Sequence, residues 1–167
     1  MIILKANKLL FKNFSAFLAL GFGSGLITKA PGTFGTLVAI PIFLFLQFLS
    51  QSLIYLFIIT MFFIGIYVAD KTSQALAIKD PSCIVIDEIV GFLLLLVLVV
   101  HVPGTEISIT KIDYILAFIL FRIFDIWKPF PIDFLEKKFK GGFGIMIDDV
   151  GAAIYAYIIF ILIHYAI

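Results

Sequence analysis

Residues 87–100 read Asp87-Glu88-Ile89-Val90-Gly91-Phe92-Leu93-Leu94-Leu95-Leu96-Val97-Leu98-Val99-Val100, two acids followed directly by an unbroken apolar run. This run extends to residue 102, and four further apolar stretches occupy residues 37–49, 53–69, 112–127 and 152–167. Each is somewhat shorter than the ~20 residues that cross a bilayer core without tilt. The pattern predicts an all-α fold, a polytopic membrane helical bundle with about five hydrophobic helices.

The composition indicates that lipid is the surrounding solvent. Of the 167 residues, 63% are hydrophobic and 14% are charged, and the mean hydropathy is +1.20. Ordinary soluble domains are ~45–50% apolar and ~25% charged. The length predicts a single domain over residues 1–167. Because Cys83 is the only cysteine, the chain forms no intrachain disulfide and no cysteine-based zinc site.

The charges are few and unevenly placed. A formal net charge of +1 lacks the basic face that nucleic-acid binding needs, so no nucleic-acid partner is expected. Lys5, Lys8 and Lys12 instead form a small cluster suited to anionic membrane lipids. The positive-inside rule places the amino terminus and the loops 70–87 and 128–149 in the cytoplasm, and the 50–52 turn and the 101–111 loop outside. All the motif-bearing loops then share the cytoplasmic face.

Two acidic pairs are the strongest candidates for chemistry. Asp87 and Glu88 open one apolar run, and Asp148 and Asp149 precede another, so we expect both pairs at helix starts. One acid in each pair is explained as a helix-capping residue, but two acids at a membrane boundary are costly without a function. Carboxylate oxygens are the ligands that Mg²⁺ prefers. We therefore predict a metal site formed by all four acids.

A row of alternating charges precedes Pro129. Arg122, Asp125 and Lys128 recur at every third residue, which places neighbours on a shared side of a helix. The row is either a neutralising ion-pair network or a phosphate clamp in which Asp125 orients the cations or transfers a proton.

A glycine-rich segment lies near the amino terminus. The apolar but glycine-broken residues 14–26 predict a re-entrant or interfacial element. Glycine backbone amides, hydroxyls and a lysine in and after this element could bind a phosphate, and packing glycines between helices are the alternative. The candidates are Gly23, Ser24, Gly25, Lys29, Gly32, Thr33 and Thr36.

Four segments in this order resemble the phosphatidylglycerophosphatase A family, over about residues 14–160. They are Gly21-Phe22-Gly23-Ser24-Gly25 with Ala30-Pro31-Gly32-Thr33-Phe34-Gly35-Thr36; Asp80-Pro81 with Ile86-Asp87-Glu88-Ile89-Val90-Gly91; Phe121-Arg122-Ile123-Phe124-Asp125-Ile126-Trp127-Lys128-Pro129 with Pro131; and Gly141-Gly142-Phe143-Gly144-Ile145-Met146-Ile147-Asp148-Asp149-Val150. Four ordered motifs are far more specific than any one of them.

The resemblance implies a Mg²⁺-dependent phosphatase of the bacterial inner membrane. Such an enzyme converts phosphatidylglycerophosphate to phosphatidylglycerol in phospholipid biosynthesis. The four acids would hold Mg²⁺, while Arg122, Lys128 and Lys29 would neutralise the phosphate. Attack by water and an aspartyl-phosphate intermediate both remain open. The alternatives from other classes are a small ion- or proton-coupled transporter and a non-catalytic membrane subunit.

Overall fold

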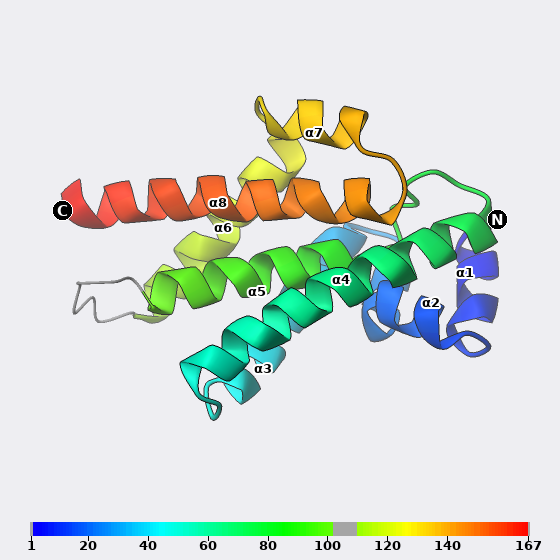
Figure 1. The fold of residues 1–167 in the computed structure, drawn as a ribbon, viewed down its shortest axis with the longest axis horizontal. Coiled ribbons are helices and arrows are strands. Elements are labelled where there is room, and N and C mark those ends of the chain that lie inside the picture. The colour runs from blue at the N-terminus through cyan, green and yellow to red at the C-terminus, as the bar shows by residue number, and fades with distance from the viewer. Residues whose placement is uncertain (1, 102–109, 167) are drawn as a thin grey trace.

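The computed structural model describes residues 2–101 and 110–166, and every regular element in these ranges is helical, as predicted (Figure 1). The elements are α1 (Ile2–Leu10), α2 (Phe14–Ala19), a short 3₁₀ helix η1 (Gly21–Leu26), α3 (Pro31–Leu46), α4 (Gln51–Leu76), α5 (Ile86–Val100), α6 (Lys111–Trp127), α7 (Ile132–Lys138) and α8 (Gly142–Ala166). The expected all-α class is therefore confirmed.

Each of the five predicted apolar stretches lies largely in one helix, namely α3, α4, α5, α6 and α8. Two of these, α4 and α8, are long and apolar enough to cross a membrane, judged by length and composition over the described residues. Most of the predicted 101–111 loop and the last residue of the final stretch lie outside the described residues.

Helix α5 is the centre of the molecule. It packs against α3, α4, α6 and α8, and ten of its fifteen residues are buried, on all sides of the helix. A helix that is apolar all round is buried either in a protein core or in lipid, and here neighbouring helices cover most of its residues. The uninterrupted apolar run after Asp87 and Glu88 therefore makes this helix the core, and the two acids lie in its first turn.

Two predicted loops are instead the starts of helices. Pro31 to Thr36 form the first turns of α3, where a proline at the first position costs no hydrogen bond. Helix α8 begins at Gly142, so the prediction that Asp148 and Asp149 start their helix was wrong. They lie about two turns inside it. The α8 start is held by Asp70 of α4, whose Oδ1 accepts a hydrogen bond from the Gly142 N–H (3.3 Å).

The glycine-rich segment packs on the chain that leads into α5. The backbone folds back at Gly21, Phe22 and Gly23, which all have positive φ, and the Val85 N–H donates to the Ala19 carbonyl (2.9 Å). A Cβ on Gly25 would lie 2.0 Å from the Cys83 carbonyl oxygen. The element positions the start of α5, and its predicted interfacial or re-entrant character stays a prediction.

We expect Gly25→Ala to destabilise the fold by about 1–3 kcal/mol, the usual cost of forcing atoms into a packed interior. The backbone carbonyl that it meets cannot rotate away as a side chain could. Cys83 is buried and is the only thiol, so the temperature at which a thiol-reactive dye labels it in detergent measures unfolding. This temperature should fall in the variant, and an unchanged labelling temperature would contradict the packing described here.

Candidate active site

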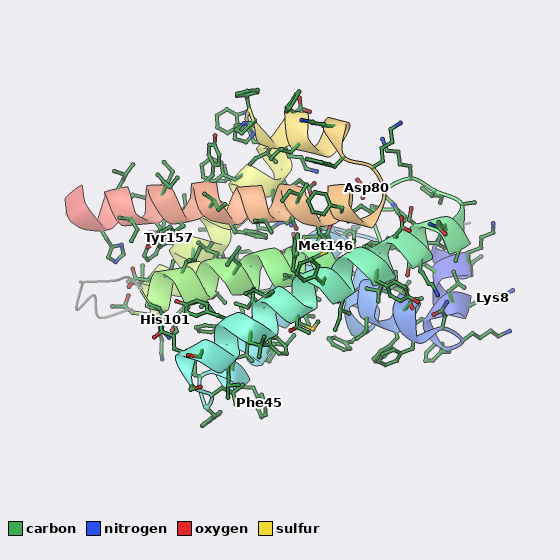
Figure 2. The ribbon with its side chains drawn as sticks, viewed as in Figure 1. Lys8, Phe45, Asp80, His101, Met146 and Tyr157 are labelled. Carbon is green, nitrogen blue, oxygen red and sulfur yellow. The ribbon has the colours of Figure 1, made fainter. Side chains whose placement is uncertain are left out.

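The helix ends that carry the motifs meet at one end of the bundle. The starts of α3, α5 and α8 lie there with the last turns of α6, as their contacts show. In Figure 2, Asp80 and Lys8 lie toward this end, and His101 lies toward the other. His164 also lies at that other end, 3.3 Å from Asp113 at the start of α6. Both histidines therefore lie away from the end that carries the acidic motifs.

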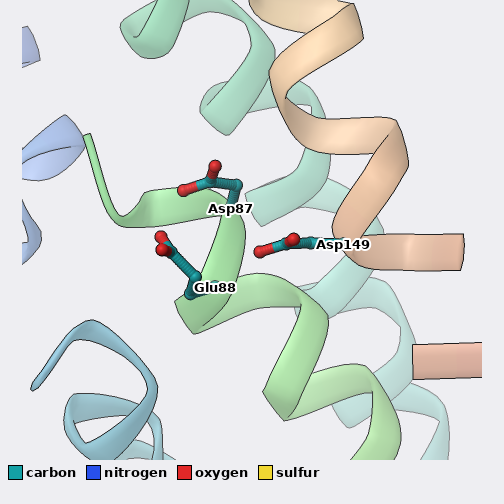
Figure 3. A group of neighbouring side chains, drawn as sticks. All are labelled: Asp87, Glu88 and Asp149. Atoms are coloured by element: carbon teal, nitrogen blue, oxygen red, sulfur yellow. The ribbon is translucent and has the colours of Figure 1, made fainter. Parts of the chain in front are cut away.

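Three of the four predicted acids converge. Each of Asp87, Glu88 and Asp149 offers a carboxylate oxygen within 4.8 Å of those of the other two. Figure 3 shows Asp87 and Glu88 in the first turn of α5 and Asp149 reaching toward them from α8. Gly91 permits this approach, because a Cβ at that position would lie 2.9 Å from the Asp149 Cβ. These three residues are called the acid cluster below.

The acid cluster holds polar atoms that the described residues leave unsatisfied. Asp87 Oδ1, Glu88 Oε2 and Asp149 Oδ2 are all buried without a hydrogen-bond partner in that part of the chain. Burying a carboxylate oxygen without a partner is costly. A hard divalent cation, which prefers oxygen ligands, could bind these three carboxylates together. The donor set therefore fits Mg²⁺.

Burial is the main cause that raises the pKa of both acids of the α5 pair. Burial raises the pKa of Glu88 to about 8; Asp149 and Asp125 push it up further, while a hydrogen bond with Asp87 and the charge of Arg122 lower it. Burial also raises the pKa of Asp87 well above its usual range, with Glu88 as the next cause. Without a cation, the pair is stabilised by protons, which a bound metal must displace.

Arg122 borders the acid cluster. Its Nη1 donates to Asp125 Oδ2 and lies 3.9 Å from Glu88 Oε1. Gly32 of α3 lies against both side chains, because a Cβ there would lie 2.2 Å from Glu88 Oε1 and 3.0 Å from Arg122 Nη1. Asp125 thus contacts the guanidinium, its two predicted roles stay predictions, and Gly32 leaves space beside Arg122.

The remaining acid and cation form a second pair. Lys128, in the left-handed conformation just after α6, donates from Nζ to Asp148 Oδ2 (2.5 Å). Asp148 also raises the pKa of Asp87 through its charge, so it lies near the acid cluster without joining its contacts. A small cavity of about 40 Å³ beside Asp148 is also lined by Lys79 and Asp80, and it has room for a few water molecules.

Most other predicted phosphate ligands are engaged elsewhere. The Ser24 hydroxyl donates to the Gly21 carbonyl (2.8 Å), and the buried Thr36 hydroxyl donates to the Gly32 carbonyl (2.8 Å). Gly25 packs on Cys83. The structure places Gly23 near Leu10, Thr33 partly buried in the first turn of α3 and Lys29 exposed before α3. Among these candidates, Gly32 alone has a described contact with the acid cluster.

Two positions that matter were given no role from the sequence. Gly91 sets the distance between α5 and α8, and Asp70 caps α8. A glycine inside an apolar helix is a common sign of close helix packing, so Gly91 carried a usable signal. Asp70 is the first acid in the chain and follows an apolar stretch, but its partner 72 residues away could not be read from sequence.

The sequence profile of the family described as Phosphatidylglycerophosphatase A matches residues 17–164. A phosphatidylglycerophosphatase A of Haemophilus influenzae is 42% identical over 89% of this chain and 87% of its own. That of Escherichia coli is 37% identical over 82% of this chain and 76% of its own.

A third relative has a different name. The protein, from Bacteroides thetaiotaomicron, is provisionally named a phosphatidylinositol-3-phosphatase and is 40% identical over 83% of this chain and 86% of its own. No solved structure matches the chain. The family profile covers the acid cluster, Arg122 and Gly32 alike. The chain therefore belongs to the phosphatidylglycerophosphatase A family of phosphatases.

Proposed function

We propose that this phosphatase depends on Mg²⁺ and hydrolyses phosphatidylglycerophosphate to phosphatidylglycerol and phosphate in bacterial phospholipid biosynthesis. The acid cluster carries the proposal, because three buried carboxylates with unpartnered oxygens lie next to an arginine. The names of the Haemophilus influenzae and Escherichia coli relatives supply the substrate.

Asp87, Glu88 and Asp149 would hold the Mg²⁺. When bound, the ion would neutralise charge on the phosphate oxygens and make a water molecule more acidic. Asp148 would stay with Lys128, next to the acid cluster. Four acids were expected to share the metal, and the contacts support three of them as direct ligands and Asp148 as their neighbour.

The basic residues would bind the substrate phosphate. Arg122 has its guanidinium fixed by Asp125 and directed past Gly32, so it loses little side-chain freedom when it pairs with phosphate oxygens. Lys128 would add a second positive charge from the Asp148 side of the site. The cavity beside Asp148 would give water access to the reacting phosphate.

The protein would be a multi-pass protein of the bacterial cytoplasmic membrane, with the active site on the cytoplasmic side. Two helices, α4 and α8, have the length and apolarity to span. No acid occurs among the first 69 residues, whereas Lys5, Lys8, Lys12 and Lys29 do. This excess of lysines is typical of the cytoplasmic side, and Lys8 lies toward the same end of the fold as Asp80 (Figure 2).

The alternatives from other classes lack comparable support. A transport site is expected near the middle of the bundle, whereas the acid cluster lies near helix starts at one end. A non-catalytic subunit would not need unpartnered buried oxygens beside a fixed arginine.

The decisive experiment is phosphate release by the purified protein in detergent, with Mg²⁺ and with a chelator. Phosphatidylglycerophosphate and phosphatidylinositol 3-phosphate would be compared at equal surface concentration, since the relatives differ in the headgroup that they are named for. We expect Mg²⁺-dependent release from phosphatidylglycerophosphate at the higher kcat/KM. Preference for the inositol lipid would overturn the substrate, and full activity with the chelator would overturn the metal.

The raised pKa of Glu88 predicts how stability and metal binding vary with pH. A carboxyl whose pKa is higher in the folded than in the unfolded protein stabilises the fold below its unfolded value, and this stability is lost as pH rises through about 8. Without metal, the protein should therefore unfold more easily at about pH 8.5, where this stability has been lost, than at about pH 5, where most of it is present. Added Mg²⁺ should stabilise it most at the higher pH.

Calorimetry tests this linkage directly. Because Mg²⁺ must displace protons from the acid cluster, the binding heat at neutral pH should change with the ionisation enthalpy of the buffer. Equal heats in PIPES and Tris buffers would show that no proton is released, and would contradict the raised pKa values of the pair.

A further inference from the structure

An apolar groove runs between α3 and α6 above α5. It encloses about 310 Å³, within the range of small-molecule sites. Its walls are Ile40 and Leu44 of α3 and Tyr114 and Ile115 of α6, and its floor is Phe92 and Leu96 of α5. Two of these side chains, Leu44 at 55% and Ile115 at 60%, are more than half exposed.

The groove continues to the active site. Phe92 of its floor contacts the ring of Phe118, with centroids 5.7 Å apart. Phe118 and Arg122 together line a second depression of about 420 Å³ along α6. Arg122 in turn lies 3.9 Å from Glu88 of the acid cluster. The groove and this depression are therefore neighbours through the Phe92–Phe118 contact, and the depression includes the guanidinium that lies beside the acid cluster.

The span from the far end of the groove to Arg122 is close to the length of one acyl chain in a leaflet. Lys111 lines the groove, and Arg122 lies further along α6, in the second depression. At 1.5 Å per residue these two positions are about 16 Å apart along α6, and half of a hydrocarbon core is about 15 Å. A molecule that fills the groove with its charge at Arg122 would have an anionic head and an apolar tail of about this length.

We propose that the α3–α6 groove binds one acyl chain of the lipid substrate while its phosphate lies at Arg122 and the acid cluster. This assignment rests on the proposed function and adds the position of the chain. A comparable apolar cavity of about 400 Å³ lies between α4, α5 and α8. No charged side chain lines that cavity, whereas the depression next to the α3–α6 groove is lined by Arg122.

A tryptophan that fills the groove should change chain-length preference. The variant is Leu44→Trp on the α3 wall, and the matched control is Leu56→Trp on α4, which is 59% exposed and outside the described cavities. Activity would be measured on dioleoyl and dihexanoyl phosphatidylglycerophosphate. In Leu44→Trp the ratio of long-chain to short-chain kcat/KM should fall about tenfold or more, as expected when apolar pocket contacts are lost. The control should keep the wild-type ratio.

A second measurement does not depend on turnover. The wild-type protein would be reconstituted in phosphatidylethanolamine vesicles containing phosphatidylglycerol with a diazirine in one acyl chain, and the crosslinked peptides would be identified by mass spectrometry. Crosslinks in α3 and α6 that decrease in Leu44→Trp support the groove. Crosslinks confined to α4 and α8, or an unchanged chain-length ratio in an active Leu44→Trp enzyme, would overturn it. Failure of the wild type to hydrolyse either lipid would instead count against the proposed function, and the crosslinks would still decide the groove.

Discussion

Asp149→Asn is expected to remove phosphate release while the helical fold persists. The asparagine keeps the size of the side chain but cannot supply an anionic oxygen to a cation held with Asp87 and Glu88. A loss of about 4 kcal/mol of transition-state stabilisation lowers kcat/KM roughly 10³-fold. Phosphate release and Mg²⁺ binding by calorimetry should both show the loss.

The stability of this variant separates a lost ligand from a damaged fold. Asp149 is buried beside two other carboxyls, and removing one charge from such a group relieves repulsion. Without metal, Cys83 should therefore become reactive at a temperature no lower than in the wild type. Asp133→Asn makes the same chemical change in the first turn of α7 and should keep activity within about twofold. Mg²⁺-dependent activity at the wild-type level in Asp149→Asn would exclude Asp149 as a ligand.

Gly32→Ala should cost about 10²-fold or more in kcat/KM with little loss of stability, because small misplacements in an active site have effects of this size. The new Cβ would lie 2.2 Å from Glu88 Oε1 and 3.0 Å from Arg122 Nη1. Both atoms end flexible side chains, so they can move and the fold survives. In moving, they would leave the geometry that binds metal and phosphate.

Gly151→Ala is the matched control. It also adds a methyl group inside a helix, and the nearest atom is Cγ1 of the aliphatic Ile132 at 2.9 Å. Activity should stay within about threefold of the wild type, as for most changes away from a site. If the two variants lose activity equally, the effect of Gly32→Ala arises from helix packing and the site at Gly32 is misassigned.

Part of the site was predictable because it depends on local chemistry. Asp87 and Glu88 directly precede an apolar run, and acids are favoured in the first turn of a helix, where the structure has them. Arg122 and Asp125 were expected on one side of a helix that ends before Pro129, and Arg122 does donate to Asp125. Both conclusions need only helix periodicity and the properties of proline.

The glycine-rich segment shows where local reasoning ends. Its glycines fit equally well with a phosphate loop and with close packing. The structure separates them: Gly25 packs against Cys83, whereas Gly32 faces Glu88 and Arg122. This difference arises from the neighbour that each glycine meets, and those neighbours lie more than 50 residues away in the chain.

The sequence by itself determined that this protein is an all-helical, strongly apolar chain with a few acids and cations at the ends of its helices, because hydropathy and helix signals are local properties. Only the tertiary structure decided that Asp149 joins Asp87 and Glu88 while Asp148 pairs with Lys128. Adjacent residues of a helix point about 100° apart, so the rotation of α8 against α5, which Gly91 permits at close range, selects the acid that enters the site.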